Sequence, residues 1–323
     1  MTTAPHGALA RGRSRARGSS LARAEDRTGK AMVSPTVLVV IGVVILPFLI
    51  SVVYAFQEFR LIDIGPLGTG ETTWTLDNFR QVLANERYRD SLVTTIVFAT
   101  ATTVGSITVG TAVAMSLRRQ FPGRGLVRAL VLVPYVLPVV AAAMIWEQML
   151  NPQYGVANAV GQQYLDWARP ISFLTTESME VWGLPVPVAL SVVVLFDVWK
   201  TAPLAYLFVT ARMQAVPKEL EEAALIDGVT PSQNFRHVIL PQLYGVLAIL
   251  TVLRFIWSFQ SFNEIYLLTG GAGGTEVLAV EVYNELNQQG DIGTASALGL
   301  VMMAFLGVLT LVYLRMSRKE LAP

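Results

Sequence analysis

Residues 217–241 read PKELEEAALIDGVTPSQNFRHVILP and form a charged insert between two long apolar runs. The pattern predicts two short helices. Pro217 suits a first helical position, and the glutamates that follow it favour the positive end of a helix dipole. Gly228 is typical of a helix end, and Thr230 with Pro231 is typical of a new helix start. A structured polar segment between apolar runs predicts a rigid projection on one side of a membrane.

One face of the first predicted helix carries small side chains. Leu220, Ala223, Ala224 and Asp227 follow the i, i+3, i+4, i+7 spacing, so they share that face. Small side chains allow another surface to approach closely, which favours a docking site for a second protein. The alternative is an amphipathic connector that lies on the membrane surface.

Composition predicts an all-α polytopic membrane protein. The 323 residues are 53% hydrophobic and 15% charged, and the mean hydropathy is +0.51, values that soluble domains rarely combine. A membrane span needs about 20 mostly apolar residues. Six segments meet this requirement, near 33–57, 91–117, 126–149, 186–211, 242–268 and 292–315.

The segments outside the spans divide the chain into three parts. Residues 1–32 form an Arg-rich leader that is too long and too polar for a cleavable signal peptide, and its Ser, Gly and Ala content predicts disorder. Residues 33–316 form the membrane domain, and 317–323 form a short tail. The leader is expected to act as a topology determinant, with anionic lipid or nucleic acid binding as alternatives.

The distribution of positive charge predicts the orientation. With the N-terminus inside, 17 of the 24 Lys and Arg residues lie in inner segments and only five in outer segments. Positive residues collect on the cytoplasmic side of membrane proteins. Both termini and residues 217–241 are therefore expected in the cytoplasm, on the side where ATP is present.

The insert is similar to the EAA loop of permease subunits in bacterial ABC importers. The resemblance rests on Glu222-Ala223-Ala224, on Gly228 four residues after Ala224, and on Leu240-Pro241, with Val238 where that pattern usually has Ile. The flanking sequence resembles the maltose-permease branch. The resemblance implies a six-span type I importer fold in the bacterial inner membrane, with both termini in the cytoplasm. It implies that the following residues couple the chain to an ATPase: Glu221, Glu222, Ala223, Ala224, Asp227, Gly228, Leu240 and Pro241.

The same resemblance implies a multi-subunit assembly. The expected partners are a second homologous permease, two ABC ATPase subunits, an extracytoplasmic solute-binding lipoprotein and a carbohydrate, with no role for nucleic acid. No cofactor is expected on this chain, and ATP and Mg²⁺ are expected in the ATPase. A P-loop needs GxxxxGK[ST], whereas the only Gly-Lys pair, Gly29-Lys30, is followed by Ala31. No disulfide or thiolate site is expected, since the chain has no cysteine.

Polar residues within the spans indicate where a substrate passes. A charge at bilayer depth is costly unless it is paired or lines a cavity. Asp197 and Lys200 lie three residues apart and are expected to pair on one helical face. Arg254, Ser258 and Ser261 share one face of the fifth span. Such groups suit a hydroxyl-rich sugar, and the alternative is interhelical hydrogen bonding that only holds the bundle together.

The resemblance to the maltose permease places sugar contacts on the spans before and after the insert and on the third span. The expected pathway residues are Tyr135, Asp197, Lys200, Thr201, Leu204, Arg254, Ser258, Ser261, Asn263 and Glu264, and Val139 is a further candidate. Charged residues stand where the maltose type is more neutral. A trehalose-type or maltose-type disaccharide and a phosphorylated sugar such as glycerol 3-phosphate therefore both remain candidates.

Two other functions remain open at this point. An ion-coupled secondary sugar transporter would use intramembrane carboxylates such as Asp197 and Glu264. A membrane scaffold would have no substrate. The Gly-rich stretch in the outer segment 269–291 is predicted to be flexible, and in sugar permeases a similar stretch faces the substrate-binding protein.

Overall fold

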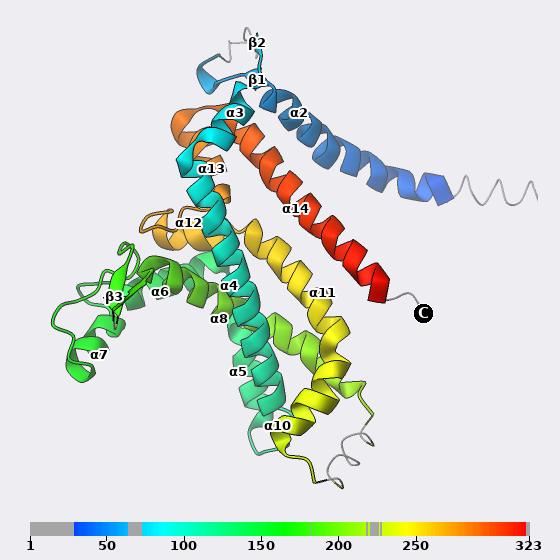
Figure 1. Cartoon of the computed structure of the whole chain (residues 1–323), viewed down its shortest axis with the longest axis vertical. Coiled ribbons are helices and arrows are strands. Elements are labelled where there is room, and N and C mark those ends of the chain that lie inside the picture. The colour runs from blue at the N-terminus through cyan, green and yellow to red at the C-terminus, as the bar shows by residue number, and fades with distance from the viewer. Residues whose placement is uncertain are drawn as a thin grey trace, which may run out of the picture.

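The computed structural model describes residues 29–63, 73–181, 183–217, 219, 226 and 228–320. Within these residues five helices are long and apolar enough to cross a membrane, and a bent pair of shorter helices makes a sixth span if it is counted as one. The fold is therefore an all-α polytopic bundle, as predicted (Figure 1). The long helices are the N-terminal helix Gly29–Ala55, α4 (Glu86–Ser116), α8 (Val188–Gln214), α11 (Leu240–Phe259) and α14 (Ile292–Glu320).

The N-terminal helix includes the π-helical stretch η1 (Ile41–Ile45) and α2 (Leu46–Ala55). The other short elements are β1 (Gln57–Glu58), η2 (Leu61–Asp63), β2 (Thr73–Trp74), α3 (Asp77–Ala84), α5 (Arg124–Val136), α6 (Val139–Leu150), α7 (Val156–Tyr164), β3 (Met179–Val181), β4 (Leu184–Val186), α10 (Pro231–Asn234), η3 (Phe235–Ile239), α12 (Asn263–Thr269), α13 (Leu278–Asn284) and η4 (Glu285–Gln289). Among the residues that the structure describes, the strands form two antiparallel pairs, β1 with β2 and β3 with β4.

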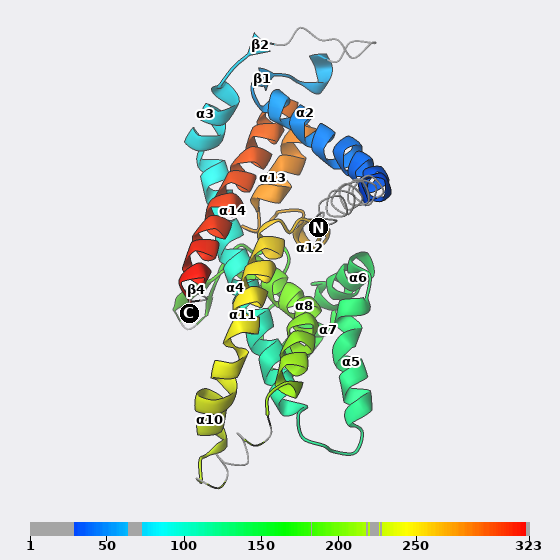
Figure 2. The same ribbon diagram turned by 90° about the vertical axis from the view of Figure 1, so that its right-hand side faces the viewer.

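The N-terminal helix Gly29–Ala55 projects away from the bundle (Figures 1 and 2). None of its most apolar 18-residue window is buried within the chain, so this surface is available to lipid or to another subunit. Helix already covers residues 29–32, which the sequence assigned to the leader, because Gly29 and Lys30 continue the same helix. At the other end α14 extends to Glu320, into the predicted tail.

The centre of the bundle is the contact between α4 and α8, where two glycines of α4 allow a close approach. A Cβ atom on Gly110 would lie 2.6 Å from the carbonyl oxygen of Ala202 and 2.6 Å from the Cβ of Ala205. A Cβ on Gly105 would lie 2.6 Å from a methyl carbon of Val198. Small residues at such positions are a common means of packing helices in membranes.

The third predicted span, 126–149, is two helices rather than one. α5 and α6 are bent by 98° at a break that contains Leu137 and Pro138. Pro138 has no N–H to donate and disfavours helical geometry in the residue before it, and Leu137 is accordingly extended, with ψ 134°. The sequence predicted one span here and did not predict the change in direction.

The fifth predicted span, 242–268, is also shorter than expected. α11 ends at Phe259, and α12 starts at Asn263 as a separate helix. The polar run after Phe259 provides a local alternative to helical hydrogen bonding, since the Ser261 hydroxyl donates to the Glu264 carboxylate at 2.6 Å. Asn263 and Glu264 therefore belong to α12 and not to the fifth span.

The described part of the insert matches its predicted local structure. Gly228 has a φ of 72°, which suits a helix end, and Thr230 forms a reciprocal capping box with Gln233 at the start of α10. Pro241 lies in the first turn of α11. Five predicted coupling residues lie outside the described residues: Glu221, Glu222, Ala223, Ala224 and Asp227.

The Gly-rich stretch 270–274 packs against its own chain. Gly270, Gly271, Gly273 and Gly274 all have positive φ, and a Cβ on Gly273 would lie 3.1 Å from the backbone of Thr175. The hydroxyl groups of Thr269 and Thr275 lie 2.6 Å apart and join the two ends of the stretch. The glycines allow this compact turn, and the flexibility of the stretch stays a prediction.

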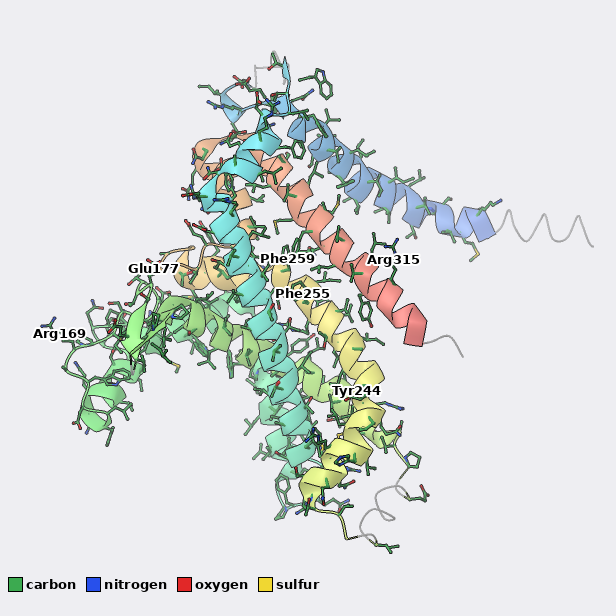
Figure 3. All side chains as sticks on the ribbon, viewed as in Figure 1. Arg169, Glu177, Tyr244, Phe255, Phe259 and Arg315 are labelled. Carbon is green, nitrogen blue, oxygen red and sulfur yellow. The ribbon has the colours of Figure 1, made fainter. Side chains whose placement is uncertain are left out.

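Aromatic contacts fix α11 within the bundle. Phe259 stacks on Phe305 of α14, with ring centroids 5.0 Å apart, and its side chain is fully buried. Phe255 and Phe259 lie in the upper half of α11, whereas Tyr244 lies toward its lower end and is exposed (Figure 3). The apolar packing therefore orients the face of α11 that carries Arg254 and Ser258 toward α4 and α8.

Candidate functional site

A buried ion pair joins two of the long helices. Arg254 of α11 donates from Nη2 to Oδ2 of Asp197 on α8 at 2.7 Å, and both side chains are about 95% buried, with 5% and 4% exposed. The same Nη2 donates to the Ser258 hydroxyl at 3.1 Å. Two opposite charges in contact satisfy each other where neither reaches water. The structure thus brings together Asp197, Arg254 and Ser258, three of the predicted site residues.

Helix α4 adds a residue that the sequence analysis missed. Nε of Arg254 lies 3.4 Å from the hydroxyl of Ser106, which is fully buried on α4. Ser106 continues a row of buried hydroxyl residues on one face of α4, namely Ser91, Thr95, Thr102, Thr103 and Ser106. Their near-helical spacing within an apolar run is the feature that could have identified this polar face.

The sequence predicted that Lys200 pairs with Asp197, and this prediction is wrong. Its ammonium group donates to the carbonyl oxygen of Leu137 at 2.9 Å. This carbonyl lies at the break between α5 and α6, where Pro138 has interrupted the helical ladder. The lysine satisfies an oxygen that the break has released, while Asp197 is already occupied by Arg254.

The remaining predicted pathway residues surround this cluster with different degrees of exposure. Thr201 donates to the Asp197 carbonyl oxygen at 2.6 Å along its own helix. Thr201, Leu204, Ser261 and Glu264 are half-buried, and so is Val139. Asn263 is exposed at the start of α12, and 44% of Tyr135 is exposed on α5. The structure therefore separates a buried ion pair from more accessible polar groups on α5, α8 and α12.

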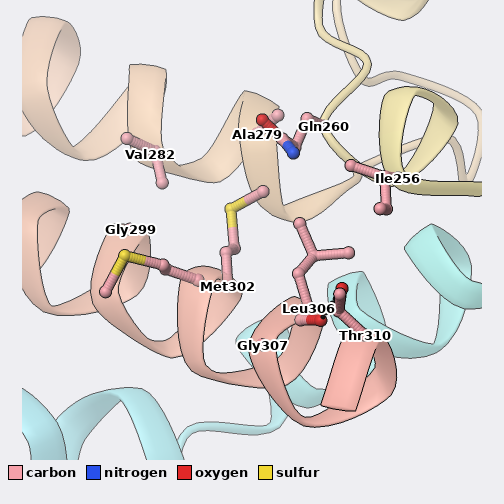
Figure 4. Close-up of a pocket in the computed structure, with 10 residues that line it drawn as sticks. Ile256, Gln260, Ala279, Val282, Gly299, Met302, Leu306, Gly307 and Thr310 are labelled. Atoms are coloured by element: carbon pink, nitrogen blue, oxygen red, sulfur yellow. Dashed lines mark hydrogen bonds between the residues drawn. The ribbon is translucent and has the colours of Figure 1, made fainter. Parts of the chain in front are cut away.

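A separate cavity of about 530 Å³ lies between α11, α13 and α14 (Figure 4). Its lining is mostly apolar, with Gln260 and Thr310 as the polar side chains, and the rest is Ile256, Ala279, Val282, Gly299, Met302, Met303, Leu306 and Gly307. A hydrated ligand with many hydroxyl groups needs several convergent hydrogen-bonding partners. This cavity lacks them, and it contains none of the predicted pathway residues.

The insert lies between the two helices that carry the ion pair. α8 ends at Gln214 and α11 begins at Leu240, so residues 215–239 connect the helix of Asp197 to the helix of Arg254. α10 and the loop between α4 and α5 lie at the same end of the bundle (Figures 1 and 2). Displacement of the insert would act on both helices that carry the ion pair.

Comparison with known proteins agrees with this arrangement. Residues 106–321 match the family model described as binding-protein-dependent transport system inner membrane component. The chain is 32% identical to the trehalose/maltose transport system permease protein MalF of Thermococcus litoralis, over 93% of this chain and 97% of that one. It is 30% identical to the sn-glycerol-3-phosphate transport system permease protein UgpA of Agrobacterium fabrum, over 76% and 80%. In fold it is similar to a chain of a bacterial ABC transporter for the acidic polysaccharide alginate, with a TM-score of 0.78 at 20% identity, covering 92% of this chain and 97% of that chain.

Proposed function

The chain belongs to the binding-protein-dependent transport system inner membrane components, the permease subunits of ABC importers, and on that premise we propose that it carries a disaccharide across the inner membrane. It is a multi-pass transport subunit and not a catalytic one. The proposal for the cargo rests on the trehalose/maltose relative and on the polar side chains that line the path. In this proposal the sugar arrives from an extracytoplasmic binding protein.

One observation carries the coupling part of the proposal: the insert connects α8 directly to α11. Docking of residues 217–241 in an ATPase subunit would move the lower ends of both helices. Closure of the ATPase around ATP would then favour one arrangement of α8 against α11 over another, which is the differential interaction that alternating access requires. ATP and Mg²⁺ would act in the partner subunits, and a second permease would complete the pathway.

We assign different roles to the buried and the accessible polar residues. Tyr135, Thr201, Leu204, Ser261, Asn263 and Glu264 would contact the passing sugar because they are exposed or half-buried. Lys200 would line the same path while it holds the break between α5 and α6. Asp197, Arg254 and Ser258 would hold α8 against α11 behind this surface. Release of the sugar requires that such a site bind it weakly.

The charge balance favours a neutral sugar over a phosphorylated one. Arg254 is neutralised by Asp197, so it is not available to a phosphate without a rearrangement. Lys200 uses one of its three N–H donors on a carbonyl oxygen, so a phosphate would meet one uncompensated cation here and not two. The relative named for glycerol 3-phosphate transport makes that substrate the second candidate. A competition assay with trehalose, maltose and glycerol 3-phosphate against uptake by the assembled transporter would distinguish them.

The coupling role is tested by separating transport from sugar capture. We expect Glu222→Ala and Gly228→Asp to abolish uptake, while the binding protein still captures sugar. In Gly228→Asp the reason is local, since a side chain at a φ of 72° strains the turn that positions the insert. Unchanged uptake in both variants would contradict the coupling role. Uptake by this chain alone, without an ATPase, would support a secondary transporter instead.

A further inference from the structure

Arg212 joins the two helix ends between which the insert emerges. It lies in the last turn of α8, and its Nε donates to the carbonyl oxygen of Gln242 in the first turn of α11 at 2.9 Å. A cation is favoured at the C-terminal end of a helix. A carbonyl oxygen has two lone pairs, so Gln242 can accept from Arg212 and also accept a bond within α11. This hydrogen bond closes the base of the insert.

The same two helix ends share an apolar contact. Met213 of α8 and Leu243 of α11 are buried neighbours of Arg212 and Gln242 in the sequence, and both belong to one apolar cluster. Ile239, directly before α11, is buried in the same cluster. The contact excludes water, which strengthens the hydrogen bond of the half-buried Arg212 beside it.

The second half of the insert is continuous with α11. α10, the π-helical stretch η3 and α11 form one helix from Pro231 to Phe259. Gln242 and Arg254 both lie on this helix, about 18 Å apart at a rise of about 1.5 Å per residue. If Gln242 is held, a force applied to α10 is transmitted along the helix to Arg254. If Gln242 is free, the same force separates the lower ends of α8 and α11.

We propose that Arg212 is a positioning residue for coupling. Its bond to Gln242 fixes the base of the insert, so that movement of an ATPase subunit reaches the polar site and does not end in a local separation of α8 from α11. This role rests on the coupling function proposed above for residues 217–241, and it adds a residue outside that range. The sequence did not predict it, because the acceptor is a backbone oxygen 30 residues further along the chain.

The mechanical part is tested on the full chain in nanodiscs, without an ATPase. The chain has no cysteine, so spin labels at Gln214→Cys and Ser232→Cys report one distance across the base of the insert. Both positions are exposed. Arg212→Met keeps an unbranched side chain but removes the donor, so it should widen the distance distribution. Arg212→Lys keeps a donor and should keep the distribution narrow.

The matched control is Arg124→Met, which removes the same kind of bond. Arg124 at the start of α5 donates from Nε to the carbonyl oxygen of Leu117, which caps α4, at 2.8 Å. This bond lies at the same end of the bundle but does not join α8 to α11. Arg124→Met should therefore leave the distance distribution narrow, although it costs the fold a comparable hydrogen bond.

The coupling part is tested in the assembled transporter by the sugar taken up per ATP hydrolysed. Radiolabelled trehalose, maltose and glycerol 3-phosphate serve as the probes. We expect Arg212→Met to lower this ratio about tenfold while ATP hydrolysis continues, since one hydrogen bond to a charged group is lost. Arg212→Lys should recover most of the ratio, and Arg124→Met should keep it. A general loss of folding would instead lower uptake and hydrolysis together.

An unchanged ratio or an unchanged distance distribution in Arg212→Met would overturn the role of Arg212. The coupling role of the insert would then still stand if Glu222→Ala abolishes uptake. Uptake that persists in Glu222→Ala and Gly228→Asp would remove the coupling role itself, and with it the premise for Arg212.

Discussion

Arg254 lies in an apolar helix, and its charge is tolerated because a countercharge and two hydroxyl acceptors lie beside it. Asp197 and Ser258 accept from Nη2 at 2.7 and 3.1 Å, and Ser106 accepts from Nε at 3.4 Å. A buried pair of this kind adds little net stability, but the loss of one member leaves a charge without compensation. The pair therefore specifies how α8 and α11 meet more than it strengthens the bundle.

This interpretation predicts a non-additive response to substitution. Asp197→Ala leaves Arg254 buried without a countercharge and should reduce the free energy of unfolding by about 3–5 kcal/mol. Asp197→Leu combined with Arg254→Met removes both charges and should recover most of that loss. Thermal unfolding of the purified chain in nanodiscs measures both effects. Equal and additive losses in the single and double variants would show that the two side chains do not interact.

At the scale of elements, the contact between α4 and α8 depends on Gly110. A Cβ atom at this position would lie 2.6 Å from the carbonyl oxygen of Ala202 and 2.7 Å from the backbone nitrogen of Tyr206. Backbone atoms cannot move aside as a flexible side chain does. α4 provides Ser106 and α8 provides Asp197, so the same contact aligns two parts of the polar cluster. Separation of the helices would therefore disturb the polar cluster as well as the packing.

We predict that Gly110→Val destabilises the bundle by about 1–3 kcal/mol through overpacking and also lowers uptake. The matched control is Gly245→Ala on α11, where a Cβ would meet no atom within 4 Å and alanine is the better helix former. Thermal unfolding and uptake would be measured for both. A Gly110→Val variant with the stability of the control would mean that α4 and α8 move apart without cost.

Helix α13 is held to the start of α4 by a buried carboxylate. Glu281 is fully buried; its Oε1 accepts from Nε of Arg87 at 3.0 Å and from Ser91 at 3.2 Å, and its Oε2 lacks a partner among the described residues. Glu276 adds negative charge nearby. Burial raises the pKa of Glu281, and the positive charge of Arg87 opposes this rise only in part.

A raised pKa in the folded state gives this contact a pH dependence. Between the ordinary glutamate pKa of 4.5 and the raised folded pKa, the folded chain keeps a proton that the unfolded chain has lost. The contribution of Glu281 to the free energy of unfolding should therefore fall as the pH rises through that interval. Thermal unfolding over a pH series should show this slope in the wild type and not in Glu281→Gln. Parallel curves for the two proteins would contradict the assignment.

At the scale of the whole molecule, the orientation of the bundle determines whether the insert can meet an ATPase. The chain has no cysteine, so single introduced cysteines report accessibility without background. Ser232 is exposed on α10, and Gln153 is exposed on the segment between α6 and α7. In intact cells an impermeant maleimide should label Gln153→Cys and should label Ser232→Cys only after permeabilisation. The reverse pattern would place the insert outside and exclude its coupling role.

The sequence predicted those features that depend on residues close together in the chain. The apolar runs predicted a polytopic bundle, Gly228 and Thr230-Pro231 predicted a helix end and a helix start, and the spacing around Glu222-Ala223-Ala224 indicated the transporter family. These features depend on neighbours in the chain, on side-chain polarity over one span, and on φ preferences of single residues. The polar residues of the fourth and fifth spans were identified for the same reason.

Which polar groups meet depended on the tertiary structure. Asp197 could reach Lys200 along its own helix, but α11 brings Arg254 within 2.7 Å, and the break at Pro138 gives Lys200 a carbonyl acceptor instead. The contacts of Gly110 with α8 and of Ser106 with Arg254 depend on the packing of α8 and α11 against α4, so the sequence did not predict them. The composition and periodicity of the sequence therefore determined the membrane-spanning class and the polar insert between two spans. Helix packing decided the partner of each buried charge. A charge removed from water is costly unless an opposite charge or a hydrogen-bonding group contacts it, and packing brings such groups together from distant parts of the chain.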